Sequence, residues 1–155
     1  MHFEGEVRAE WLKHDGDDRR MRLLEQFVFV DDNGQRWVAE VNDEVDGASI
    51  PRFLWTVAGS PFVGDYRRAS VIHDVECQRK LRPSKDVHQM FYEAMRCDGV
   101  PDDTALKFYT AVRLFGPRWE VTPAGEVRVF AATARVRPGV TFEQVSSVLD
   151  AVLDE

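Results

Sequence analysis

A histidine and an aspartate stand side by side at positions 73 and 74, inside the apolar stretch ASVIHDVEC. An imidazole beside a carboxylate can bind a divalent metal ion or transfer a proton, and the same pair can also serve as a buried hydrogen-bonded anchor. The segment DGASIP contributes two further polar residues, Asp46 and Ser49, just before a predicted helix. We expect this segment to fold back so that Asp46 and Ser49 lie beside the imidazole of His73.

These four residues, His73, Asp74, Asp46 and Ser49, are the candidate catalytic set. His73 would act as a base or metal ligand, an aspartate would fix its tautomer, and Ser49 would orient the ring or a substrate. A nucleophilic serine needs a neighbouring base, which His73 would have to supply, and the sequence around Ser49 is not GxSxG. The structural alternative is that Asp46 begins a turn and Ser49 caps the following helix.

A divalent metal ion is the candidate cofactor, with His73, Asp46 and Asp86 as its predicted ligands. The position of Asp86 also has a structural explanation: it falls in the first turn of a predicted helix, where the helix dipole stabilises a carboxylate. His73 and Cys77 share a helix face at the i, i+4 spacing and could both bind zinc, but two ligands do not make a site. We therefore interpret Cys77 as a small buried apolar residue, and we expect His88 to be exposed.

Strand patterns dominate the first third of the chain. Residues 23–41 hold two runs rich in Val, Phe and Trp on either side of DDNG, which predicts an antiparallel hairpin with Asn33 and Gly34 in its turn. Residues 3–12 alternate weakly and predict a further strand, and the acidic residues 14–20 predict a loop.

From residue 49 the apolar pattern becomes helical. A short helix over SIPRFLWTVA should be followed by three longer ones, at about 65–81, at 85–97 after a capping Ser84, and at 101–116. Beyond these we expect a strand within 125–136, then a helix over 141–153 opened by a Thr141–Gln144 capping box.

This element order predicts an α+β fold. We expect an N-terminal antiparallel β-hairpin or meander packed on a three-helix core, followed by a C-terminal strand–helix extension. We assign residues 1–119 to a single domain and residues 120–155 to the extension, which is packed on the domain or appended to it.

Composition narrows the class of protein. The chain has 155 residues, 44% of them apolar and 30% charged, which is typical of a soluble globular protein. Its net charge of −7 argues against nucleic acids or anionic membranes as partners. No run approaches the roughly 18 apolar residues of a membrane span, and the charged first residues do not resemble a secretory leader. We therefore expect a cytoplasmic protein whose two cysteines, Cys77 and Cys97, are reduced.

Four segments, in the order DGASIPRFLW, GDYRRASVIHD, DVHQMFYEAM and FYTAVRLFG, resemble the phage- and prophage-associated family of domain of unknown function 1353. The resemblance covers about residues 23–119. It implies that the matching polar positions are Asp46, Ser49, His73, Asp74 and Asp86, with a framework of Pro51, Trp55, Tyr66 and Gly116. The chain departs from the pattern after the His-Asp doublet, where Val75, Glu76 and Cys77 replace the usual aromatic or aliphatic residues.

The resemblance implies a phage- or prophage-type accessory protein, cytoplasmic or virion-associated, with phage structural or host cell-wall components as partners. Our first interpretation is a non-catalytic binding or assembly module. A buried polar network of the four candidate residues would stabilise it, with Arg52 or Arg113 paired to the His-Asp doublet. The alternative is a metal-assisted or acid–base hydrolase that uses His73, Asp74 and Asp46 in one pocket, with a peptidoglycan bond as substrate.

Overall fold

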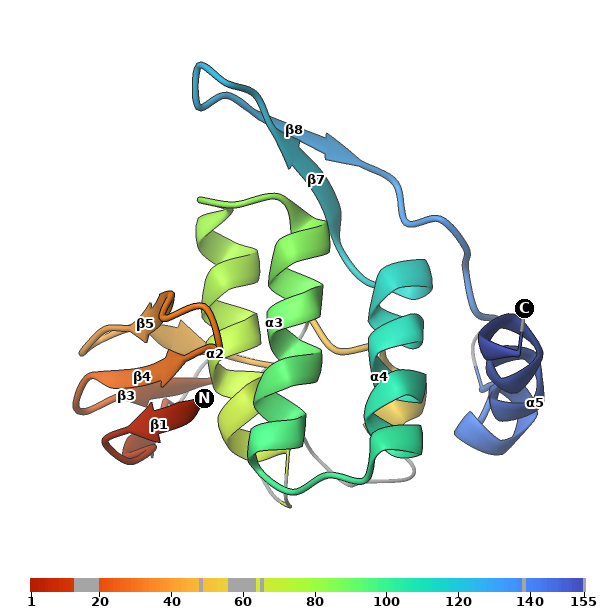
Figure 1. The fold of residues 1–155 in the computed structure, drawn as a ribbon, viewed down its shortest axis with the longest axis horizontal. Helices are drawn as coiled ribbons and strands as arrows, with labels where there is room; N and C mark the ends of the chain where they lie inside the picture. The colour runs from red at the N-terminus through yellow and green to blue at the C-terminus, as the bar shows by residue number, and fades with distance from the viewer. Residues whose placement is uncertain (13–19, 48, 56–63, 65, 138, 155) are drawn as a thin grey trace.

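The computed structural model describes the chain except for residues 13–19, 48, 56–63, 65, 138 and 155, and it confirms the α+β class (Figure 1). Its elements, in chain order, are β1 (His2–Glu4), β2 (Ala9–Trp11), β3 (Met21–Leu23), β4 (Phe27–Val30), β5 (Arg36–Ala39), β6 (Glu44–Val45), the 3₁₀ helix η1 (Arg52–Leu54), α2 (Arg67–Arg79), α3 (Ser84–Cys97), α4 (Asp102–Phe115), β7 (Arg118–Val121), β8 (Val127–Phe130) and α5 (Phe142–Leu153).

Within the described residues, the strands pair antiparallel in three small sheets, ordered β1-β4-β5, β2-β3-β6 and β7-β8. The predicted hairpin is the β4–β5 pair, in which Phe29 lies opposite Trp37. Its turn takes a positive φ of 76° at Gly34, as expected, but Asn33 does not. Instead, Oδ1 of Asp31 accepts the backbone N–H groups of Asn33 and Gln35, each at 2.9 Å, and closes the turn.

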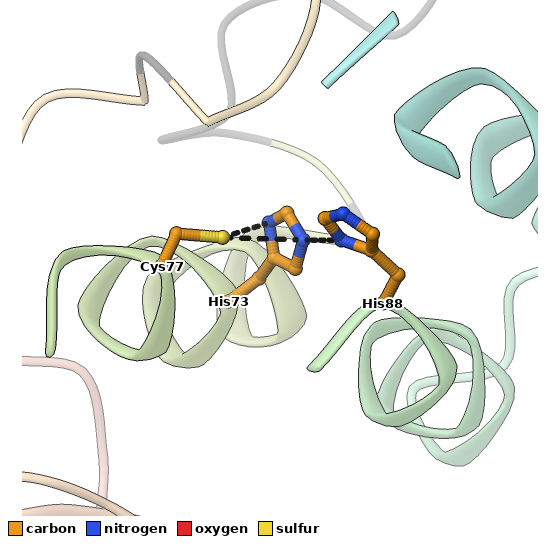
Figure 2. Close-up of side chains that lie close together, drawn as sticks. All are labelled: His73, Cys77 and His88. Atoms are coloured by element: carbon orange, nitrogen blue, oxygen red, sulfur yellow. Dashed lines mark hydrogen bonds between the residues drawn. The ribbon is translucent and has the colours of Figure 1, made fainter. Parts of the chain in front are cut away.

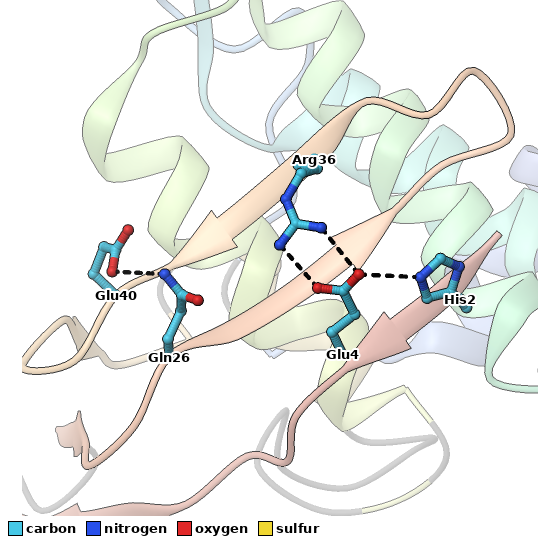
Figure 3. Close-up of polar contacts among 5 residues, drawn as sticks. All are labelled: His2, Glu4, Gln26, Arg36 and Glu40. Carbon is cyan, nitrogen blue, oxygen red and sulfur yellow. Dashed lines mark hydrogen bonds and ion pairs between the residues drawn. The ribbon is translucent and has the colours of Figure 1, made fainter.

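The two faces of the β1-β4-β5 sheet differ, because successive side chains of a strand point in opposite directions. Phe27, Phe29 and Trp37 are buried on the inner face. On the outer face, the guanidinium of Arg36 donates to both carboxylate oxygens of Glu4, at 2.8 and 2.9 Å, across the central strand (Figure 3). The inner face is therefore the one that packs on the helices.

Helix α2 is the central element of the fold. It contacts β4, β5 and β6 on one side and α3 on the other, and α3 in turn packs on α4. All residues from Ala69 to Cys77 are consequently buried, including His73, Asp74 and Glu76. Because a buried polar group without a partner is costly, His73 and Asp74 are expected to find hydrogen-bond partners on neighbouring elements.

Several local predictions were imprecise. The predicted loop 14–20 lies outside the described residues except for Arg20. Of the predicted helix SIPRFLWTVA, residues 52–54 form the 3₁₀ helix η1 and Trp55 is α-helical, while residues 56–58 lie outside the described residues. The predicted boundary between residues 119 and 120 falls inside β7, which pairs with β8. The division of the chain at that point stays a prediction.

The C-terminal helix α5 packs against α4. The predicted capping box is present: Gln144 N–H donates to the hydroxyl of Thr141, and Thr141 N–H donates to Oε1 of Gln144. Val145 and Leu149 are buried, and Lys107 of α4 forms an ion pair of 3.2 Å with Asp150. Among the described residues, no helix combines the length and apolar composition that crossing a membrane requires.

Replacing Leu149 with alanine should lower the free energy of unfolding by about 2 kcal/mol, because its buried side chain would leave a cavity between α5 and α4. Val148→Ala is the matched control, since Val148 is 56% exposed and its loss should cost less than about 0.5 kcal/mol. Urea unfolding of the full chain measures both. Equal effects would show that α5 does not contribute to the cooperative core.

Candidate functional site

The DGASIP segment folds back onto α2, as predicted. The backbone N–H of Asp46 donates to Oδ2 of Asp74 at 3.1 Å, and the backbone N–H of Ser49 is 3.4 Å from Oδ1. The side-chain amide of Gln78 donates to Oδ2 at 3.0 Å. Burial raises the pKa of Asp74 despite these donors. Asp74 thus anchors the segment, and Asp46 meets it through its backbone amide.

Ser49 does not cap a helix. The residue that precedes η1 is Pro51, and no side chain caps that turn. The hydroxyl of Ser49 lies instead 3.2 Å from Nδ1 of His73. The prediction that Ser49 could neighbour the imidazole is therefore confirmed, and the capping interpretation is wrong.

Two other predicted partnerships are also wrong. Ser84 does not cap α3; its hydroxyl donates to the carbonyl of Trp119 at 2.9 Å and accepts the N–H of the same residue at 3.1 Å. The guanidinium of Arg52 lies over Trp55, and that of Arg113 donates to the hydroxyl of Tyr109. Neither forms an ion pair with His73 or Asp74 among the described residues, although the charge of Arg113 contributes to lowering the pKa of His88.

His88 is the functional candidate that sequence reasoning missed. It is 2% exposed rather than solvent-facing, and its Nδ1 lies 2.8 Å from Nε2 of His73 (Figure 2). Its other ring nitrogen, Nε2, lies 2.9 Å from the carbonyl oxygen of Pro117. The sequence did carry a signal for the burial of His88. This residue precedes the buried Phe91 by three positions and so shares the apolar face of α3.

The hydrogen bonds fix the tautomers of both imidazoles. The carbonyl of Pro117 can only accept, so Nε2 of His88 carries the proton and its Nδ1 is an acceptor. Nε2 of His73 must then donate to His88, which leaves Nδ1 of His73 as the acceptor that faces the hydroxyl of Ser49. The result is a directional chain of three donors, Ser49 to His73 to His88 to the Pro117 carbonyl.

Burial keeps the cluster neutral. It places the pKa of His73 well below its ordinary value, with a further contribution from His88. Burial is also the main reason that the pKa of His88 falls to about 4. The ring of Phe91 stacks on His73 with centroids 4.5 Å apart, which excludes water from one face of the imidazole. Both imidazoles are therefore uncharged at neutral pH.

Cys77 completes a group of three potential metal ligands. Its Sγ lies 3.6 Å from Nε2 and 3.9 Å from Nδ1 of His73, and burial raises the pKa of its thiol. One ligand atom from each of His73, Cys77 and His88 can be chosen so that all lie within 4.8 Å of one another. Within the described part of the chain, this is the group with metal-ligand spacing.

The predicted metal set of His73, Asp46 and Asp86 is not brought together in this group. Asp86 is exposed at the start of α3 and lines a separate pocket beside Asp31 and Glu93. Asp46 lies at the pocket next to Asp74. A role for Asp46 or Asp86 in metal binding stays a prediction.

A pocket of about 370 Å³ opens beside the donor chain. Ser49 and Cys77 line it, while His73 lies behind Ser49. The residues that line it carry both signs of charge: Arg20, Lys80, Glu44, Asp46 and Asp74. The arrangement places the hydroxyl of a pocket-lining serine 3.2 Å from the neutral imidazole of His73, and the same side chain also hydrogen-bonds Asp74.

Comparisons with known proteins give a family but no activity. The family model described as "Protein of unknown function (DUF1353)" matches residues 21–112. "Uncharacterized protein y4jT" of Sinorhizobium fredii (strain NBRC 101917 / NGR234) is 45% identical over 106 residues, which cover 68% of this chain and 32% of that protein. "Uncharacterized protein y4iH" of the same strain is 40% identical over 111 residues, covering 72% and 46%. The chain thus spans less than half the length of both curated relatives, and no solved structure matches it.

Proposed function

This chain belongs to the DUF1353 family, and from the site described above we propose that it is a hydrolase that works by acid–base catalysis, with Ser49 as nucleophile and His73 as base. The observation that carries the proposal is the donor chain from Ser49 through His73 and His88 to the Pro117 carbonyl. A nucleophile, a base and a third group that orients the base are the three parts of serine-type catalysis.

Each residue has a defined role in the reaction. The oxygen of Ser49 attacks an acyl carbon in the pocket while its proton passes to Nδ1 of His73. His88 holds the ring of His73 through the 2.8 Å contact at Nε2, so that Nδ1 keeps facing Ser49. The imidazolium then returns the proton to the leaving group, and water releases the acyl group from Ser49 by the same steps in reverse.

The non-catalytic module is the second candidate, and a specific observation favours it. His73 is completely buried with both ring nitrogens bonded, and both oxygens of Asp74 accept hydrogen bonds. A fully paired polar network can fix a unique packing without any chemistry. The hydrolase differs from the module in requiring that Ser49 be reactive from the pocket.

A fluorophosphonate probe tests this requirement directly. We expect the wild-type chain to be labelled at Ser49, as mapped by peptide mass spectrometry, and Ser49→Ala to remain unlabelled. Ser146→Ala is the control, because Ser146 lies on α5 and bonds Lys107. Hydrolysis of p-nitrophenyl acetate should fall roughly 100-fold in Ser49→Ala. A folded wild-type chain that is neither labelled nor active would reject the hydrolase and favour the module.

The natural substrate and setting form part of the same proposal. The family resemblance supports a peptidoglycan bond as substrate class and phage structural or host cell-wall components as partners. The net charge of −7 supports the exclusion of nucleic acids. A cytoplasmic or virion-associated location is proposed on the same grounds.

A further inference from the structure

We propose that His73, Cys77 and His88 form a binding site for zinc or a similar divalent transition metal, and that the ion takes the place of the proton that the two imidazoles share. Binding itself is independent of the hydrolase. Its consequence for catalysis, inhibition by metal, rests on the proposed function.

The donor atoms are of the kind that zinc prefers. Two imidazole nitrogens and one thiol sulfur converge from α2 and α3, with Nε2 of His73 2.8 Å from Nδ1 of His88 and 3.6 Å from Sγ of Cys77 (Figure 2). His73 and Cys77 are one helical turn apart, so their relative position is set by α2, and the α2–α3 contact supplies the third ligand. The sequence pattern alone showed two of these ligands.

The outer contacts of the imidazoles also suit a metal site. A metal-bound histidine usually donates its other ring N–H to an oxygen, which holds the ring in place. Nε2 of His88 meets the Pro117 carbonyl at 2.9 Å, and Nδ1 of His73 meets the Ser49 hydroxyl at 3.2 Å. Each ring is thus held by an oxygen at one nitrogen, while the two nitrogens that would bind the metal, Nε2 of His73 and Nδ1 of His88, face each other.

Metal binding has a simple proton balance. The thiol of Cys77 loses its proton to solvent and binds as thiolate, which leaves the site with one net positive charge. The proton on Nε2 of His73 is displaced to Nδ1, so this imidazole stays neutral and donates to Ser49 instead of accepting from it. Three protein ligands leave a fourth tetrahedral position for water.

The same exchange makes metal and catalysis mutually exclusive. Once Nδ1 of His73 carries a proton, it can no longer take one from the hydroxyl of Ser49. The contact between Nε2 of His73 and His88 is also replaced by bonds to the ion. Zinc therefore acts as an inhibitor, because it interrupts the donor chain between His73 and His88.

Cobalt(II) titration of the full reduced chain tests the site, because a cobalt–thiolate bond produces an ultraviolet charge-transfer band and tetrahedral cobalt absorbs in the visible. We expect a single site whose bands disappear when zinc is added. Cys77→Ala should lose the charge-transfer band and weaken cobalt binding roughly 100-fold or more. Cys97→Ala is the matched control, since Cys97 is only partly buried and lies at the far end of α3 from His88.

The outcomes separate the two proposals. No cobalt bands in the folded wild-type chain, or identical titrations of wild type and Cys77→Ala, would overturn the metal site whatever happens to Ser49. Circular dichroism of each variant establishes that it is folded, and Cys77→Ser, which keeps the side-chain volume, replaces Cys77→Ala if the alanine variant unfolds. Labelling of Ser49 without cobalt binding would leave the hydrolase intact, and cobalt binding without labelling would leave only the metal site.

Discussion

Replacing Trp119 with alanine is expected to lower the free energy of unfolding by about 4 kcal/mol, because a large and almost fully buried side chain would be lost from the core. The indole N–H donates to the carbonyl of Arg82 at 2.7 Å, and the indole and imidazole rings of Trp119 and His88 form a T-shaped contact with centroids 6.1 Å apart. Its backbone bonds Ser84 through both N–H and C=O. Trp119 thus joins β7 to the start of α3.

Urea unfolding monitored by circular dichroism measures the effect. Trp11→Ala is the matched control, because Trp11 is 62% exposed and its removal should cost less than about 1 kcal/mol. A loss for Trp119→Ala no larger than for Trp11→Ala would mean that β7 is not part of the cooperative core. The result also bears on the site, since Trp119 supports His88.

The second large effect is expected for Asp74→Ala, which should cost about 3 kcal/mol. The carboxylate accepts backbone N–H groups from Asp46 and Ser49, and the alanine variant leaves these donors without their acceptor. The segment that carries Ser49 would lose its anchor on α2. Labelling of Ser49 by the fluorophosphonate probe should therefore fall together with stability.

Asp86→Ala separates this effect from a general loss of negative charge. Asp86 is exposed in the first turn of α3, so its removal should cost no more than about 1 kcal/mol from the helix dipole. Asp74→Asn keeps one acceptor oxygen, so its loss of unfolding free energy should lie between those of Asp74→Ala and Asp86→Ala. Equal stability of Asp74→Ala and Asp86→Ala would show that the buried carboxylate does not hold the segment.

Local sequence patterns were enough to predict most of the secondary structure. The alternation in residues 23–41 and the Asn33-Gly34 pair predicted the β4–β5 hairpin, and the apolar spacing predicted α2, α3 and α4 to within about two residues at most ends. The capping box before α5 was readable because both partners lie within four residues. Such features depend on neighbours along the chain, so tertiary contacts were not needed to find them.

Errors arose where a polar side chain had two possible partners, one close in sequence and one distant. Ser49 and Ser84 both precede helical segments and looked like caps, yet both bond residues more than twenty positions away. A hydroxyl has only one proton to donate. The bond to the distant partner stabilises the protein more, because that partner is buried and would be costly to leave unpaired. Sequence spacing does not reveal which partner is buried.

The amino-acid order alone established the α+β class, the helix face shared by His73 and Cys77, and the candidacy of Ser49 and Asp74. It did not establish the pairing of His73 with His88, or the role of the Pro117 carbonyl in fixing their protons. Those contacts depend on how α2 and α3 are rotated against each other and on where the chain turns after α4. Packing of the whole core sets both, because ring nitrogens on separate helices come within 2.8 Å only when the surrounding side chains fit together.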